Sequence, residues 1–162
     1  MQQSFAGSQS NFLPKDISGS SPAQALVLDT NVVLDLLVFH DPVCRRLADA
    51  LERGAWRWLA TRPMRDEFDD VLGRPAFERW AGQRKSIATH WARWAAIIEA
   101  APLVPPGPTL RCGDPDDQMF LDLALVLRPS HLLTRDRELL RLAGPASSLG
   151  VRVCTPANFG AP

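Results

Sequence analysis

Apolar and polar positions along the chain come in blocks that predict buried strands, each followed by a helix. The apolar run that starts at Ala25 ends at Asp29, and apolar residues then resume with helical spacing. A short continuous apolar run ending in polar residues is typical of a buried strand in a parallel sheet. The pattern therefore predicts a strand at 25–29, a helix directly after it, and a second helix from Pro42 to Gly54.

The rest of the chain continues this order of strands and helices. Further strands are expected at 56–60, 103–104, 131–134 and 151–154, and further helices at 61–72, 83–99, 115–127 and 137–142. Such alternation implies right-handed crossovers and an α/β fold with a central parallel sheet of four or five strands. Residues 1–24 are rich in Ser, Gln, Gly and Pro, so we expect a flexible extension before one folded domain at 25–160.

Composition narrows the class of protein only a little. The 162 residues are 46% hydrophobic and 22% charged, which is ordinary for a single globular domain. The net charge of zero argues against a polybasic binder but leaves room for a local basic groove. Only Lys15 and Lys85 among the 18 basic residues are lysines. Because arginine suits bidentate contact with phosphate, a phosphate-bearing partner is compatible with this composition.

The cysteines and the lack of long apolar runs indicate the cellular compartment that we expect for the protein. Cys44, Cys112 and Cys154 are far apart and form no Cys-x-x-Cys pair. A disulfide framework or a zinc site is therefore not expected. The sequence also shows no transmembrane run and no signal-peptide pattern, so we expect no membrane association and a cytoplasmic protein.

Two acids stand where predicted strands end. Asp29 follows the first strand, and Asp136 follows the strand at 131–134. In parallel α/β sheets, ligands bind beyond the carboxyl ends of the strands, where these two side chains would meet. Asp29 could instead serve only as a helix N-cap, and Asp136 could cap the helix at 137–142 or fill both roles.

Helical phase selects two further acids. At about 100° per residue, Glu67 lies at the edge of the apolar face of its helix, whereas Asp66 lies opposite that face. Asp117 shares a face with the apolar residues that follow it, and Asp116 does not. The alternative is a local cap, with Asp114 as N-cap and Asp117 as the third residue of a capping box.

Convergent carboxylates without histidine or cysteine describe a hard oxygen site suited to Mg²⁺ or Mn²⁺. Such a site can activate water and stabilise charge on a phosphoryl oxygen. None of His40, His90 and His131 stands beside the four acids, so the sequence does not support a histidine mechanism.

The four acidic segments resemble the motifs of the PIN-domain ribonuclease family in order and approximate spacing. They are Leu28-Asp-Thr-Asn-Val32, the segment Met64–Leu72 around Glu67, Asp114-Pro-Asp-Asp117, and Leu133-Thr-Arg-Asp136, and the closing Val151–Phe159 is also similar. The resemblance covers 25–160 and implies a PIN-like α/β/α sandwich that cleaves RNA with Mg²⁺ or Mn²⁺. Many small bacterial members are toxins of toxin–antitoxin pairs, inhibited by an antitoxin protein and often homodimeric.

By this resemblance, Asp29, Glu67, Asp117 and Asp136 would be the catalytic, metal-binding acids. Asn31, Thr134 and Asp114 would support them, and Arg62, Arg65, Arg135 and Arg137, close to Glu67 or Asp136, are our candidates for RNA binding. The predicted function is a metal-dependent endoribonuclease, the toxin of a toxin–antitoxin pair. Two alternatives stay open: a PIN-like module that binds RNA or protein without cutting, and a Mg²⁺-dependent phosphohydrolase with Asp29 as nucleophile.

The segment 76–99 is unusually rich in large apolar residues. It includes Trp80, Trp91 and Trp94 and contains none of the candidate site residues. Tryptophan is enriched at the centres of protein interfaces, so this segment is a candidate surface for a partner or for self-association. The alternative is that these side chains are simply core.

Overall fold

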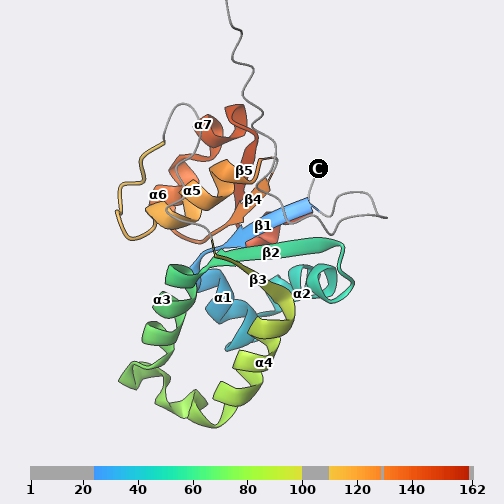
Figure 1. Ribbon diagram of the computed structural model, residues 1–162, viewed down its shortest axis with the longest axis vertical. Coiled ribbons are helices and arrows are strands. Elements are labelled where there is room, and N and C mark those ends of the chain that lie inside the picture. The colour runs from blue at the N-terminus through green and yellow to red at the C-terminus, as the bar shows by residue number, and fades with distance from the viewer. Residues whose placement is uncertain (1–23, 100–109, 129, 161–162) are drawn as a thin grey trace, which may run out of the picture.

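The computed structural model describes residues 24–99, 110–128 and 130–160, and these form an α/β/α sandwich (Figure 1). The strands are β1 (Gln24–Leu28), β2 (Trp56–Thr61), β3 (Ala95–Ile98), β4 (Ser130–Leu133) and β5 (Val151–Cys154). They make one sheet in the order β3-β2-β1-β4-β5, and every neighbouring pair is parallel. The predicted α/β class with a parallel central sheet is therefore confirmed.

Helices cover both faces of the sheet. One layer holds α1 (Thr30–Leu37), α2 (Arg45–Glu52), α3 (Arg62–Leu72) and α4 (Arg84–Trp94), and the other holds α5 (Gln118–Val126), α6 (Arg137–Arg141) and α7 (Ala143–Ser148) (Figure 1). The 3₁₀ segments are η1 (Pro42–Cys44), η2 (Pro75–Gln83) and η3 (Pro156–Asn158). Within the described ranges, no helix combines the length and the apolar character needed to cross a membrane.

The core lies along the middle strands, β1 and β4. Leu26, Val27, Leu132 and Leu133 are fully buried, because helices pack on both faces of these strands. Burial on both faces explains why these strands appear in the sequence as continuous apolar runs rather than alternating ones. Shortly after α2, Gly54 adopts φ +66°, a conformation that favours glycine, and the helix ends there as predicted.

The predicted helix at 83–99 is too long. It ends at Trp94, and Ala95–Ile98 runs alongside β2 as the edge strand β3, with Trp58 opposite Ala95 and Thr61 opposite Ile98. Short apolar runs are ambiguous between helix and strand, and pairing with β2 decides this one. The strand predicted at 103–104 lies outside the described residues, as does nearly all of the 1–24 extension.

The aromatic segment 76–99 divides into an inner and an outer part. Trp91 is 4% exposed and packs against Trp58 and Phe68, with ring centroids 4.5 and 5.0 Å away. This inner part is core, as the alternative predicted. The outer residues Phe77 and Trp80 instead pack with Phe39, whose ring lies 5.1 Å from that of Trp80 and which is 44% exposed. We call Phe39, Phe77 and Trp80 the aromatic cluster; its use as an interface stays a prediction.

Candidate active site

Asp29 lies directly after β1 and is only 2% exposed. Its Oδ1 accepts a hydrogen bond from the backbone N–H of Val32 at 2.8 Å, so the residue caps α1. Its Oδ2 accepts from the Thr134 hydroxyl and from the Arg135 backbone N–H, the latter at 3.3 Å. Burial raises the pKa of Asp29 above its ordinary value, and these hydrogen bonds oppose the rise. Asp29 is thus a helix cap whose second oxygen reaches the turn after β4.

Thr134 connects Asp29 to Asp136. It is fully buried, and its hydroxyl donates to Asp29 while accepting from the Asp136 backbone N–H at 2.9 Å. The Asp136 carboxylate in turn accepts from the backbone N–H groups of Glu138 and Leu139 at 2.7 and 3.1 Å, which makes it the N-cap of α6. The two acids at the ends of the neighbouring strands β1 and β4 therefore share one hydrogen-bonded network.

Glu67 approaches this network from α3. It is half-buried, whereas the neighbouring acids Asp66, Asp69 and Asp70 on the same helix are exposed, as helical phase predicts. Its Oε1 accepts from the Thr30 hydroxyl at 2.8 Å.

The charges around Glu67 are mixed. Its pKa is raised by burial first and then by the negative charges of Asp29 and Asp116, while the Thr30 hydrogen bond and the charge of Arg74 lower it. The sequence pattern assigned no site role to Thr30 or Arg74. A signal for Thr30 existed, because it directly follows the acid at the end of a buried strand.

Asp117 is the acid most affected by its neighbours. Burial raises its pKa to about 6, with further increases from the negative charges of Asp136, Asp29, Asp114 and Glu67. Acids from four separate segments of the chain therefore act on one carboxyl group. The structure brings the four predicted site acids together in one electrostatic environment.

The local-cap alternative for the third acidic segment is wrong in its details. The helix begins at Gln118, later than the predicted 115, so Asp117 rather than Asp114 occupies the N-cap position. The Asp117 side chain makes no capping hydrogen bond. Asp114 instead accepts from the backbone N–H of Asp116 at 3.0 Å, a local turn. Since no cap engages it, the Asp117 carboxylate stays available to a ligand.

Gln118 holds the loop before α5, a role that sequence reasoning missed. Its Oε1 accepts from the Cys112 backbone N–H at 2.8 Å, and its Nε2 donates to the Leu110 carbonyl at 2.9 Å and to Asp122 at 2.8 Å. Asn31, expected as a supporting residue, is exposed. Its backbone N–H, rather than its side chain, is among the groups that lower the pKa of Asp29.

The four candidate RNA-binding arginines differ in the contacts that they make. Arg65 pairs with Asp69 at 2.8 Å and lies over the Trp91 ring, 4.7 Å from its centroid. Arg135 pairs with Asp35 and with Asp41, each at 2.8 Å. Arg137 is exposed, and so is Arg62, which pairs with Glu99 at 3.0 Å.

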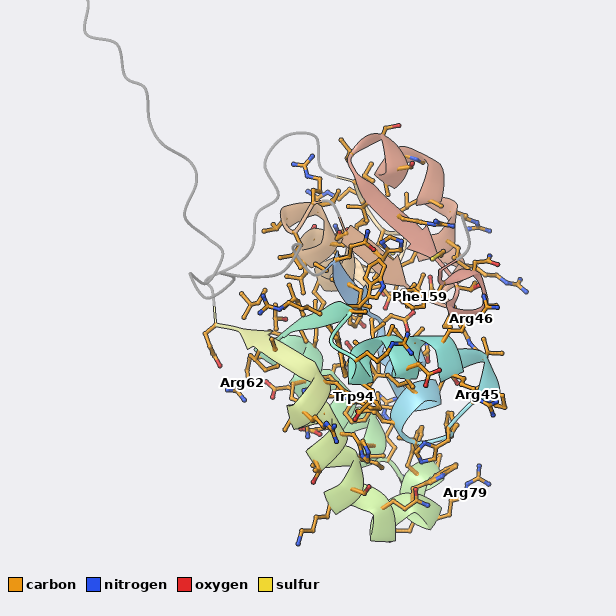
Figure 2. The ribbon with its side chains drawn as sticks, turned by 90° about the vertical axis from the view of Figure 1, so that its right-hand side faces the viewer. Arg45, Arg46, Arg62, Arg79, Trp94 and Phe159 are labelled. Carbon is orange, nitrogen blue, oxygen red and sulfur yellow. The ribbon has the colours of Figure 1, made fainter. Side chains whose placement is uncertain are left out.

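Other arginines lie away from Arg62. In Figure 2, Arg45, Arg46 and Arg79 lie along one side of the view and Arg62 lies on the other. The labelled arginines therefore do not gather into a single basic field.

Comparison with known proteins adds the family. The model of the PIN domain family matches residues 25–138, a range that includes all four acids. The chain belongs to the PIN domain family. PIN domains are generally nucleases, so family membership supports a hydrolase. No curated protein sequence matches the chain.

A solved structure supports the same fold. A chain from the crystal structure of VapBC2 from Rickettsia felis bound to a DNA fragment from their promoter aligns with a TM-score of 0.54. The sequences are 12% identical, and the alignment covers 80% of this chain and 97% of that chain. At this identity the likeness concerns the fold.

The acids of this PIN domain fit a divalent metal by their chemistry, although their atoms do not form a finished cage. Within 24–99, 110–128 and 130–160, no three His, Cys, Asp or Glu side chains already stand in a ligating arrangement. The donor set is nevertheless entirely carboxylate, and burial, followed by like charges, holds the Asp117 pKa high. A bound hard dication would offset that repulsion and draw the oxygens inward.

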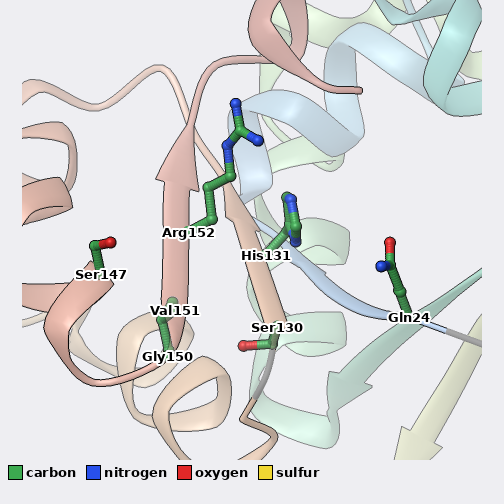
Figure 3. Close-up of a pocket in the computed structure, with 7 residues that line it drawn as sticks. All are labelled: Gln24, Ser130, His131, Ser147, Gly150, Val151 and Arg152. Atoms are coloured by element: carbon green, nitrogen blue, oxygen red, sulfur yellow. The ribbon is translucent and has the colours of Figure 1, made fainter. Parts of the chain in front are cut away.

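The pocket in Figure 3 lies elsewhere in the PIN domain. It measures about 290 Å³ and opens at the amino ends of β1, β4 and β5. Its lining residues are Gln24, Ser130, His131, Ser147, Gly150, Val151 and Arg152. None of the four acids belongs to it, because they lie at the opposite, carboxyl edge of the sheet.

Proposed function

We propose that this PIN domain is a metal-dependent endoribonuclease in which Asp29, Glu67, Asp117 and Asp136 bind Mg²⁺ or Mn²⁺. The observation that supports this most is the convergence of four acids from four separate elements at the carboxyl edge of the sheet. The choice of RNA and of these metals rests on the resemblance of the four motifs to PIN-domain ribonucleases.

The chain's own residues divide the work of such a site. Asp29 and Asp136 are held in place by backbone N–H groups and by the Thr134 hydroxyl. Glu67 on α3 and Asp117 before α5 supply the remaining negative charge. When bound, the metal would activate water and stabilise the charge that develops on the phosphodiester.

Phosphate contacts would come from the exposed arginines near the acids. Arg62 and Arg137 are exposed, as is Arg135, but Arg135 is already paired with two carboxylates. Arg74 joins Arg62 and Arg137 because its charge acts on Glu67. With a net charge of zero, RNA binding has to rest on such local contacts rather than on a general field.

A cleavage assay tests the proposal. Purified protein is incubated with mixed cellular RNA in Mg²⁺, in Mn²⁺ and in EDTA, and the comparison is repeated with Asp117→Asn and Asp116→Asn. We expect cleavage with either metal, none in EDTA, and a loss with Asp117→Asn that exceeds the roughly 10–100-fold typical of outer-shell ligand partners. Asp116→Asn is the matched control, and it should stay within about threefold of wild type, since Asp116 is exposed and its charge comes after burial among the causes that raise the Glu67 pKa.

Other outcomes support the alternatives. RNA binding without cleavage in either metal would favour a non-cutting module. Hydrolysis of p-nitrophenyl phosphate without RNA cleavage would favour a phosphohydrolase. Cleavage that persists in EDTA or in Asp117→Asn would overturn the site assignment.

We also propose that the protein is the cytoplasmic toxin of a toxin–antitoxin pair and forms a homodimer. The likeness to a chain of VapBC2 supports a protein partner. An exposed apolar surface supports it as well: Phe39 of the aromatic cluster is 44% exposed and Val43 is 41% exposed. Induced expression in a bacterial host should arrest growth, whereas expression of Asp117→Asn should not. For the dimer, size-exclusion chromatography should show a species that Trp80→Ala shifts to the monomer mass without loss of a cooperative melt.

A further inference from the structure

Arg135 sits between two site residues, Thr134 and Asp136, yet its side chain is bound elsewhere. Its Nε lies 2.8 Å from Oδ2 of Asp35, and its second guanidinium nitrogen lies 2.8 Å from Oδ2 of Asp41. The contact with Asp41 is a hydrogen bond, whereas the contact with Asp35 is an ion pair without hydrogen-bond geometry, and within the described residues no group donates a hydrogen bond to Oδ2 of Asp35. One guanidinium group still places its charge against both carboxylates, because it is planar and always charged. We call these three side chains the arginine clasp.

The clasp holds a carboxylate that would otherwise be costly to bury. Asp35 lies on α1, and its side chain is only 11% exposed, against 43% for Arg135. Burial raises the pKa of Asp35, and the charges of Asp41 and Asp29 raise it further, while Arg135 lowers it. The positive charge of Arg135 therefore offsets the negative charge of Asp35 on α1.

The backbone of the same residue contacts the site directly. The Arg135 N–H donates to Asp29 at 3.3 Å, next to the hydroxyl of Thr134, which bonds both Asp29 and the N–H of Asp136. The 134–136 turn is thus attached to the α1 region at two points. Its backbone meets the N-cap Asp29, and its Arg135 side chain meets Asp35 on α1 and Asp41 just after it.

We infer that Arg135 is a positioning residue, whose ion pairs with Asp35 and Asp41 hold the 134–136 turn so that Asp29 and Asp136 keep their places in the site. The inference rests on the proposed nuclease function for its kinetic readout only. It revises the expectation that Arg135 binds RNA, because two carboxylates already neutralise its guanidinium group.

Three variants of the full chain test the clasp: Arg135→Lys, Asp35→Asn and Asp41→Asn. Arg135→Lys keeps the charge but loses the planar fork. Asp41→Asn keeps the oxygen that accepts from the Val43 N–H at 2.9 Å, and it keeps the test decisive if Asp35→Asn does not fold. The matched control is Arg93→Gln, which breaks the Arg93–Glu52 pair between α4 and α2.

Two measurements separate the clasp from the nuclease proposal. The first is amide hydrogen exchange in the metal-free protein, and we expect the Arg135 and Asp136 amides to exchange at least about tenfold faster in the variants while the Leu132 amide is unchanged. The second is RNA cleavage with Mn²⁺, where kcat should fall about 10–100-fold with KM within about twofold of wild type. Arg93→Gln should change neither measurement.

Unchanged exchange and kcat in Asp41→Asn and Asp35→Asn would overturn the inference. So would tighter RNA binding in these variants, because that result means the carboxylates only compete with RNA for Arg135. If wild type cleaves no RNA but exchange accelerates as expected, the clasp stands and the proposed function fails.

Discussion

The two halves of the acidic site are held in different ways. In the anchored half, Asp29 and Asp136 each accept two or more hydrogen bonds from backbone N–H groups or from Thr134. In the open half, Asp117 makes no capping hydrogen bond and Glu67 accepts from the Thr30 hydroxyl. Burial and like charge dominate the open half, and they raise the pKa values of both of its acids.

This difference follows from where the residues come from. The anchored half lies at the ends of β1 and β4, which are hydrogen-bonded neighbours, so backbone donors are at hand. In the open half, Glu67 lies on α3 and Asp117 lies in the loop before α5, so neither acid directly follows a strand. We therefore expect the anchored half to be preorganised and the open half to carry repulsion that a cation relieves.

Among changes that keep all four acids, the largest expected effect comes from removing the link within the anchored half. Thr134→Val keeps the shape of the side chain but leaves Asp29 without one donor and the Asp136 N–H without its acceptor. We expect RNA cleavage or Mn²⁺ affinity to fall about 10–100-fold, as for other supporting partners of metal ligands. Unfolding free energy should also fall by about 1–3 kcal/mol, because buried polar groups lose their partners.

The matched control for this variant is Thr89→Val on α4. The Thr89 hydroxyl donates to the Lys85 carbonyl at 2.9 Å in an exposed helix turn. Steady-state cleavage, Mn²⁺ titration and urea melts are the measurements. A Thr134→Val protein as active as Thr89→Val would mean that the anchored half does not depend on the shared hydroxyl.

A smaller effect distinguishes the halves by thermal stability without metal. At pH 8, Asp117→Asn should raise Tm by at least about 3 °C, because it removes a charge that four acids repel. Asp29→Asn should lower Tm. Both Asp29 oxygens accept hydrogen bonds, so the N–H₂ group of the asparagine would face at least one donor and leave it without an acceptor. Differential scanning calorimetry in EDTA measures both shifts, and equal shifts of the same sign would erase the distinction.

The Tm gap between Asp117→Asn and wild type should depend on pH. The folded pKa of Asp117 is about 6 against an ordinary 3.8, so the folded state holds this proton more tightly. Wild type therefore loses stability relative to the variant as pH rises from about 4 to about 6, with the full gap above that range. Excess Mg²⁺ at pH 8 should close the gap by stabilising wild type alone. A gap that is constant from pH 4 to 8 would contradict the raised pKa.

The smallest expected effect concerns the arginines beside the open half and α6. Arg62→Gln with Arg137→Gln should weaken RNA binding and reduce the slope of log affinity against log salt by about 1–2. Arg45→Gln with Arg46→Gln removes the same amount of charge on the side of the view opposite Arg62 in Figure 2 and should leave the slope unchanged. Fluorescence anisotropy at several salt concentrations measures both slopes, and equal losses would indicate a nonspecific charge effect.

Much of this site could be predicted from local sequence pattern. Asp29 and Asp136 were located because a buried parallel strand appears as an apolar run and its carboxyl end is where ligands bind. Glu67 was separated from Asp66 by helical phase, a property of one helix alone. Asp117 was preferred over Asp116 by the same kind of argument, yet the helix starts one residue after Asp117, so the favourable position arises from the turn before α5.

The rest depended on contacts between distant segments. Apart from β3, the sequence alone determined the order of the central strands and their following helices and which acids end the strands, because these follow from neighbours three or four residues apart. Only the tertiary structure decided that Ala95–Ile98 is an edge strand, that Thr30 bonds Glu67, and that Arg135 turns toward Asp35. Each of these outcomes is set by which elements the sheet order brings together, and no local pattern records that.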